Sequence, residues 1–320
     1  MKDFKKIRFP IMLPLAIKWP QQLAAYSILT MLSALSFLGS KITENKPVTI
    51  PKGFDWQGHR GCRGLMPENS LPAFLRAIEI PEVVTLELDL AVSKDKQLIV
   101  SHEPWFNPAI CLQPNGDSIA SKDAEKFLIY QYTADEIRGF DCGSLGNTRF
   151  PKQEKMKTFK PVFRDLVEQV RAKRPDIRWN IEIKSQPEWD GLRHPPVEEF
   201  VQMVVAEIRN LQLEKFVTIQ SFDVRALNAL HRQAPDFQVA YLIENAFSIE
   251  SNLPKLDFVP NIYSPYYLLV DKKLVKACHS RDIKLVPWTV NDVKSMRRLI
   301  RLGVDGIITD YPNLISKVGK

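Results

Sequence analysis

From residue 54 onward, short apolar runs alternate with longer stretches in which apolar residues recur at helical spacing. In residues 70–79, for example, positions 71, 74, 75 and 78 are apolar, a spacing that predicts a helix packed on one side of a sheet. The short runs have the length and composition of strands. They lie at residues 54–59, 84–90, 178–184, 216–222, 238–243, 258–264, 283–290 and 304–310.

Eight strands in repeated strand-then-helix order, over about 265 residues, predict an α/β fold of the (β/α)8 (TIM) barrel type. A doubly wound open sheet is the competing fold, but no glycine-rich nucleotide fingerprint opens a helix. Residues 91–160 interrupt the alternation of strands and helices, with an extra predicted strand in "KQLIVSHEPWF" and then a polar loop. We therefore expect an insertion of about residues 103–160 after the second barrel strand, forming a lid or a pocket wall.

The first 40 residues have a composition of their own. Residues 1–18 hold five lysines and arginines but one acid, and residues 23–39, "LAAYSILTMLSALSFLG", carry no charge. This order predicts a secretory signal peptide, and an uncleaved N-terminal membrane anchor is the alternative. Residues 41–53 then form a spacer, and residues 54–320 form the barrel. We expect an exported protein, periplasmic or secreted, that meets a membrane only through its N-terminal segment.

The net charge of +7 does not indicate a nucleic-acid partner. More than half of this charge comes from residues 1–18, and no long basic run appears in the remainder. A predicted barrel with so small an excess of positive charge lacks the electrostatic footprint of a nucleic-acid-binding protein. The sequence carries no indication of an oligomeric state.

The four cysteines, at positions 62, 111, 142 and 278, show no CxxC motif and no metal-finger spacing. Cys111 and Cys142 both lie in loop-like sequence and form a pair if the domain is exported. We favour the other interpretation, in which the cysteines are free thiols in partly buried positions.

Acidic residues recur on one face of two predicted strands. Glu87 and Asp89 in "LELDL" point to the same face, and "NIEIKS" places Glu182 and Lys184 in the same way. A lone E-x-D pattern is more often structural, but burying acids on two strands is costly unless a cation compensates them. Three carboxylates from strand ends form an all-oxygen site, which Ca²⁺ and Mg²⁺ prefer. We expect one such divalent cation and leave the choice between the two ions open.

Two histidines and two cations follow predicted strands. His59 and His102 come at strand ends, which in a parallel barrel open towards the catalytic face. A pair of imidazoles suits general base and general acid work on a phosphodiester near neutral pH. Arg60 and Lys184 add positive charge suited to a phosphate. In "GHRGCRG", residues 58–64, we expect the glycines to let the backbone approach a ligand.

At these residues the sequence resembles the glycerophosphodiester phosphodiesterase family. The matching pieces fall in the family's order and cover nearly all of residues 54–314. They are "HRG" (59–61), "PENSLPAF" (67–74), "ELDL" (87–90), "VSH" (100–102), "IEIK" (181–184) and "VPWTVND…GVDGIITDYP" (286–312). The resemblance implies a (β/α)8 barrel that hydrolyses a small-molecule glycerophosphodiester to an alcohol and sn-glycerol 3-phosphate, with Ca²⁺ or Mg²⁺.

The resemblance also implies roles for the residues singled out above. Its functional positions are filled by Glu87, Asp89 and Glu182 as metal ligands, His59 and His102 as the catalytic pair, and Arg60 and Lys184 as phosphate-binding residues. Trp288, at a strand end within the last matching piece, is expected in the substrate pocket. In related enzymes a substrate hydroxyl attacks phosphorus, and water then opens the cyclic phosphate that forms.

The sequence departs from the family's pattern after the second histidine, where Glu103 stands in place of a frequent aspartate. This change and the long insertion leave the head group open. A lysophospholipase D or phospholipase C-like phosphodiesterase is one alternative, which a long apolar groove would favour. A non-catalytic phosphate-binding barrel is the other, and the presence of both histidines and all three acids argues against it.

Overall fold

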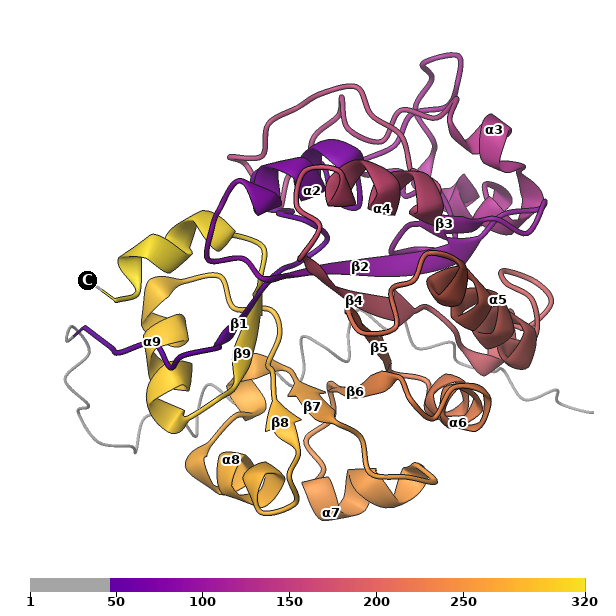
Figure 1. The fold of residues 1–320 in the computed structure, drawn as a ribbon. Helices are drawn as coiled ribbons and strands as arrows, with labels where there is room; N and C mark the ends of the chain where they lie inside the picture. Colours follow the sequence, from indigo (N-terminus) through magenta and orange to yellow (C-terminus); the bar gives the residue numbers. More distant parts are fainter. Residues whose placement is uncertain (1–46, 320) are drawn as a thin grey trace, which may run out of the picture. The chain divides into compact units, whose positions relative to one another are not determined.

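The computed structural model describes residues 47–319 (Figure 1). The predicted signal peptide or anchor, residues 1–40, and the start of the spacer lie outside the described residues. Among the described residues, no helix is both long and apolar enough to cross a bilayer.

Eight parallel strands form the barrel, in the order β8-β7-β6-β5-β4-β2-β1-β9. Main-chain hydrogen bonds from Asp305 N to Leu285 O and from Val290 N to Ile308 O, both 2.9 Å, join the two ends. The (β/α)8 prediction is therefore confirmed. The strands are β1 (Asp55–Gly58), β2 (Thr85–Val92), β4 (Arg178–Ile183), β5 (Val217–Ser221), β6 (Gln238–Ile243), β7 (Ile262–Pro265), β8 (Lys284–Leu285) and β9 (Gly306–Thr309).

Strand β8 is much shorter than the predicted run of residues 283–290. Pro287 lies in that run, and its nitrogen has no hydrogen to donate to a ladder. The chain still follows the barrel wall, because Ile308 N donates to Pro287 O at 3.1 Å. The apolar pattern thus predicted the path of the chain correctly and the length of the regular strand incorrectly.

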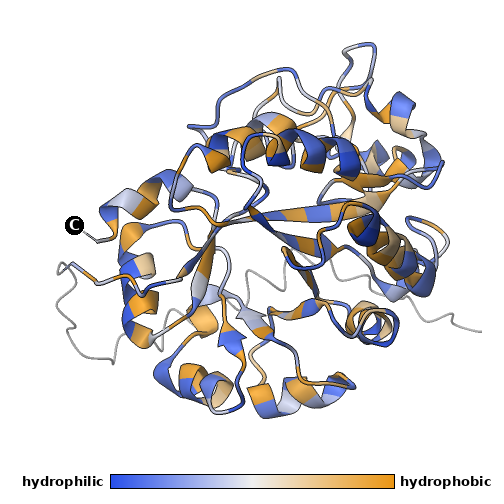
Figure 2. Ribbon diagram, in the orientation of Figure 1, coloured by the Kyte–Doolittle hydropathy of each residue, from blue (hydrophilic) through white to orange (hydrophobic). Residues whose placement is uncertain are grey.

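Amphipathic helices cover the outside of the barrel, and hydrophobic and hydrophilic residues alternate along them (Figure 2). On α9, Met296, Leu299 and Ile300 are buried, and Asp292 caps the first turn by accepting a hydrogen bond from Ser295 N at 2.8 Å. The longer helices are α2 (Leu71–Ile78), α4 (Phe163–Arg171), α5 (Val197–Asn210), α6 (Val224–Gln233), α8 (Lys272–His279) and α9 (Val293–Leu302); α7 (Ile249–Asn252) is a single turn.

The predicted extra strand, β3 (Leu98–Val100), leads into the insertion and pairs antiparallel with β2. Beyond it, short helical turns that include α3 (Ala134–Ile137) surround a small apolar core of their own. At its centre the rings of Phe106 and Phe140 stack with centroids 3.6 Å apart. The insertion is therefore a packed unit on one side of the barrel.

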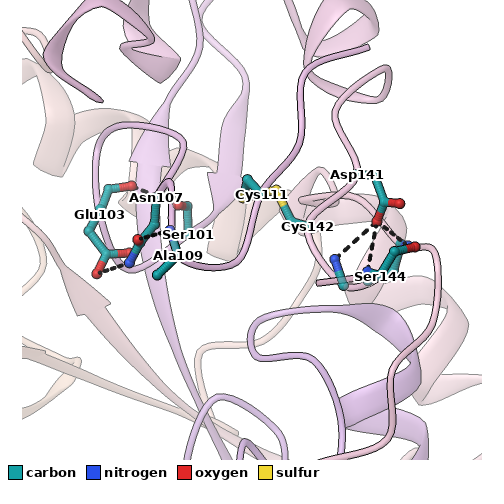
Figure 3. The surroundings of a disulfide bond; sticks show 10 residues. Ser101, Glu103, Asn107, Ala109, Cys111, Asp141, Cys142 and Ser144 are labelled. Atoms are coloured by element: carbon teal, nitrogen blue, oxygen red, sulfur yellow. Dashed lines mark hydrogen bonds between the residues drawn. A yellow bond between two sulfur atoms is a disulfide. The ribbon is translucent and has the colours of Figure 1, made fainter. Parts of the chain in front are cut away.

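A disulfide joins Cys111 to Cys142 within this small core (Figure 3). Our preference for free thiols is wrong for these two cysteines and correct for Cys62 and Cys278, which are free and buried. The pairing depends on tertiary structure, because the two cysteines are 31 residues apart in sequence. Paired main-chain hydrogen bonds between Leu112 and Asp141, 2.7 and 3.2 Å long, bring the two segments together.

Candidate active site

A cavity of about 530 Å³ opens at the carboxyl ends of the barrel strands. Seven of the eight predicted site residues line it: His59, Arg60, Glu87, His102, Glu182, Lys184 and Trp288. The eighth, Asp89, is buried behind them, with Oδ1 3.6 Å from Lys184 Nζ and Oδ2 3.3 Å from Arg60 Nε. The structure therefore brings all eight residues to one place.

The three acids meet because β2 and β4 are neighbours in register. Asp89 lies beside Glu182 in the paired strands, and Glu87 is one inward-facing position earlier on β2. One carboxylate oxygen from each residue lies within 4.8 Å of the others, and all three side chains are buried. Among the described residues, Asp89 Oδ1 has no hydrogen-bond partner although it is buried. An all-oxygen set with a free buried oxygen fits a hard divalent cation.

The charges of the acids are poorly balanced by protein groups alone. Burial and the neighbouring charge of Asp89 raise the pKa of Glu87 well above its usual range. Burial also raises the pKa of Glu182 to about 7, against the effect of Lys184. The pKa of Asp89 is held well below its usual range despite burial, chiefly by Arg60. A bound cation would relieve this repulsion and favour the ionised form of all three acids.

His59 is oriented by a buried carboxylate at the end of the last barrel strand. Its Nδ1 lies 2.6 Å from Asp310 Oδ1, and Asp310 also accepts two hydrogen bonds from Arg63 and one from Asn291. An ionised carboxylate can only accept, so the proton is on Nδ1 and Nε2 is left for the cavity. Burial and the charge of Arg63 lower the pKa of His59 to about 4, so the ring is neutral near pH 7.

His102 shows the same arrangement on the insertion side of the cavity. Its Nδ1 lies 3.0 Å from Glu103 Oε1, which again leaves Nε2 for the cavity. Burial and the charges of Arg60 and Lys184 lower its pKa. Two neutral imidazoles, each oriented by a carboxylate, therefore line one cavity.

The two predicted phosphate-binding cations lie among the acids. Arg60 Nη1 is 2.5 Å from Glu68 Oε1, and its main-chain nitrogen donates to Glu87 Oε2 at 2.9 Å. Lys184 Nζ is 2.9 Å from Glu182 Oε1. Both side chains are largely buried, where a charge interacts strongly with an anionic ligand.

The glycines around His59 are required by the packing of the protein itself, a reason that our expectation of ligand approach did not include. A Cβ on Gly58 would come within 2.2 Å of Gly61 O, and one on Gly61, where φ is +81°, within 2.6 Å of the Ala73 backbone. A Cβ on Gly64 would meet the ring of Tyr311 at 2.3 Å. These glycines are required because other parts of the chain fill the space.

Comparison with known proteins agrees with this geometry. Residues 59–314 match the sequence profile of the glycerophosphoryl diester phosphodiesterase family. The chain belongs to this family. A glycerophosphodiester phosphodiesterase of Caldanaerobacter subterraneus is 30% identical over 265 residues, which cover 82% of this chain and 97% of that protein. The chain is therefore a phosphoric diester hydrolase by homology.

Solved structures share the fold. One from Silicibacter pomeroyi, 28% identical, has a TM-score of 0.73 and covers 84% of this chain and 93% of its own. An Oleispira antarctica phosphodiesterase, solved in complex with the product sn-glycerol-3-phosphate, is 21% identical with a TM-score of 0.65 and covers 84% and 96%.

Several residues of the site were missed by sequence reasoning because their observed partners are side chains distant in the sequence. Asn69 Nδ2 donates to Asp89 Oδ2 at 2.8 Å, and Gln220 Nε2 donates to Glu87 Oε1 at 2.9 Å. Asp310 orients His59 from 251 positions away in the sequence. Asp310 ends one predicted strand and Gln220 lies near the end of another, so their position at the catalytic end of the barrel was the available signal.

Proposed function

We propose that the chain hydrolyses glycerophosphodiesters to an alcohol and sn-glycerol 3-phosphate, by acid–base catalysis with His59 and His102. The observation that carries the proposal is the pair of imidazoles, each bound through Nδ1 to a carboxylate and each lining the cavity. The product bound in the Oleispira antarctica phosphodiesterase is of the expected chemical class.

Glu87, Asp89 and Glu182 would hold one divalent cation, Ca²⁺ or Mg²⁺, because the donor set is carboxylate oxygen alone. When bound, the cation polarises a phosphoryl oxygen and neutralises the acids. Arg60 and Lys184 border the same cavity, and their charges stabilise the negative charge that develops on the phosphoryl oxygens.

Proton transfer takes place at the two Nε2 atoms. One imidazole removes the proton of a substrate hydroxyl next to the phosphoester, so that its oxygen attacks phosphorus and a cyclic phosphate forms. The other imidazole acts in its imidazolium form, with a proton on Nε2 as well as on Nδ1, and donates the Nε2 proton to the alcohol oxygen as its bond to phosphorus breaks. In the second step water opens the ring with the proton transfers reversed.

A second candidate activity is lysophospholipase D. Apolar side chains line one wall of the cavity, among them Phe222, Leu242 and Trp288, and Trp288 is held by a hydrogen bond from Nε1 to Ser264 O. Such a wall suits an apolar substituent better than a charged one.

Release of sn-glycerol 3-phosphate from glycerophosphocholine and glycerophosphoethanolamine tests the proposal. The purified protein is assayed with Ca²⁺, with Mg²⁺ and with EDTA, beside a His59→Ala variant. Lysophosphatidylcholine is the third substrate, and its cleavage is followed by the release of choline. Metal-dependent release that disappears in the variant supports the proposal. No release with either ion refutes this substrate class, and activity on the lysophospholipid alone selects the second candidate.

We also propose that the domain is exported. The disulfide supports this location, because such bonds persist in oxidising compartments and are rare in the cytosol. The intact mass of protein recovered outside the cytoplasm tests it and shows whether residues 1–40 are removed. Recovery of the reduced, full-length chain from the cytosol alone would contradict the proposal.

A further inference from the structure

The two imidazoles are oriented by carboxylates that are held very differently. Asp310 accepts hydrogen bonds from Arg63 and Asn291 in addition to His59, so both of its oxygens are occupied. Glu103 Oε1 accepts from His102 and, at 3.4 Å, from Asn107 Nδ2. Glu103 Oε2 is buried without a hydrogen-bond partner among the described residues. Apart from the nearby charges of Arg60 and Lys160, which lower the pKa of Glu103, the side chain that orients His102 depends on its local backbone for its position.

That backbone continues into a tight turn that ends at the disulfide (Figure 3). The side-chain oxygen of Asn107 accepts a hydrogen bond from Ala109 N at 3.0 Å. Its main-chain oxygen accepts from Ile110 N at 3.1 Å and from Cys111 N at 2.9 Å. Asn107 thus contacts Glu103 through its side-chain amide nitrogen, and it closes the turn to Cys111 through its side-chain and main-chain oxygens.

The other half of the disulfide is tied to a separate, well-anchored segment. Asp141 Oδ1 accepts main-chain hydrogen bonds from Gly143, Ser144 and Thr158. Cys142 N donates to Thr158 O at 2.6 Å. The disulfide therefore fastens the turn of residues 107–111 to a second segment of the insertion that has its own network of hydrogen bonds.

We propose that Glu103 is a positioning residue for His102 and that the Cys111–Cys142 disulfide fixes Glu103 through the turn of residues 107–111. Glu103 keeps the proton of His102 on Nδ1, so that Nε2 faces the cavity as a lone pair. This inference rests on the proposed function in one respect, the role of His102 as a proton carrier. It gives the insertion a direct part in orienting His102, whereas His59 is oriented by Asp310 at the end of the last barrel strand.

The tautomer of His102 tests the inference directly. The ¹⁵N spectrum of the full chain labelled at histidine reports which ring nitrogen carries the proton, and the signals of His102 are those missing in His102→Gln. We expect Nδ1–H in the wild type and a shift towards Nε2–H in Glu103→Gln, because the amide of glutamine can donate to Nδ1. Cys142→Ser should give a mixture of the two tautomers, while Cys278→Ser, at a buried free cysteine, should match the wild type.

Kinetics separate positioning from a general loss of structure. We expect kcat for sn-glycerol 3-phosphate release to fall about 10–100-fold in Glu103→Gln and about tenfold in Cys142→Ser, with KM within threefold. The double variant should be no slower than Glu103→Gln, because both changes act through His102. If Cys142→Ser does not fold, Asn107→Ala keeps the disulfide and removes the contact with Glu103, with a smaller loss of kcat expected.

Three results would overturn the inference. If His102 keeps its wild-type tautomer in Glu103→Gln, Glu103 has no positioning role. If Cys142→Ser keeps both the wild-type tautomer and the wild-type kcat, the disulfide has no part in positioning His102. Multiplying losses in the double variant show that the two changes act independently. If the wild-type protein releases no product, the proposed function fails, and the tautomer measurement still decides the positioning role.

Discussion

The replacement Asp310→Asn removes one charge from the centre of the site while preserving its shape. Asp310 is fully buried. Its Oδ1 faces His59 Nδ1 at 2.6 Å and Arg63 Nε at 2.8 Å, and its Oδ2 faces Arg63 Nη2 at 3.1 Å and Asn291 Nδ2 at 2.7 Å. All of these neighbours donate hydrogen bonds, so an amide nitrogen meets a donor wherever it is placed.

Both orientations of the new asparagine are therefore costly. If the amide nitrogen points towards Arg63 Nη2 and Asn291, the tautomer of His59 is unchanged. The amide nitrogen then faces two groups that also donate hydrogen bonds. With its amide nitrogen towards His59, it donates to Nδ1 and forces the proton onto Nε2, where the ring can no longer accept one. This second orientation is favoured, because only Arg63 Nε then remains as an opposing donor. Arg63 is left buried without an ionised partner in either case. Breaking a buried ion pair in this way costs about 3–5 kcal/mol of stability.

We expect kcat for sn-glycerol 3-phosphate release to fall by about 10²–10⁴-fold, the range in which a general acid or base contributes. Urea unfolding should show the stability loss, and the kinetic assay is run well below the unfolding midpoint. Asp271→Asn is the matched control, because Asp271 is an exposed cap of α8 that accepts from Leu274 N, and asparagine caps a helix equally well. A kcat for Asp310→Asn within threefold of the wild type would refute the tautomer argument.

Three further predictions concern metal, redox state and pH. Ca²⁺ or Mg²⁺ at about 100 times its Kd should stabilise the wild type by about 2.7 kcal/mol in urea unfolding, and Glu87→Gln should lose most of that gain. Reducing the disulfide, which closes a loop of 31 residues, should lower the free energy of unfolding by about 3–4 kcal/mol; an unchanged urea midpoint after confirmed reduction would contradict this. The pKa of His59 is lowered to about 4 in the folded protein, against about 6.5 in the unfolded chain. As pH falls from about 6.5 to about 4, the unfolded chain binds a proton at His59 before the folded protein does, so the free energy of unfolding decreases over that range. His59→Gln should show a shallower loss over that range, and equal slopes for the two proteins would exclude this cause.

The sequence by itself determined the order of the elements and which side chains face the barrel interior. In "LELDL" the alternation of period two places Glu87 and Asp89 on one side and the leucines on the other, whatever the rest of the chain does. The same rule placed Glu182 and Lys184 together. These inferences need a strand and nothing beyond it, so they could be made from neighbouring residues alone.

Only the tertiary structure decided which distant groups support those residues. The contact of His59 with Asp310 exists because β1 lies beside β9 in the closed barrel, and the disulfide forms because the insertion folds on its own apolar core. The glycines near His59 proved to be required by Ala73 and Tyr311, which no local pattern connects to them. Local alternation fixes the direction of a side chain, whereas its partners depend on strand order and packing across the whole chain.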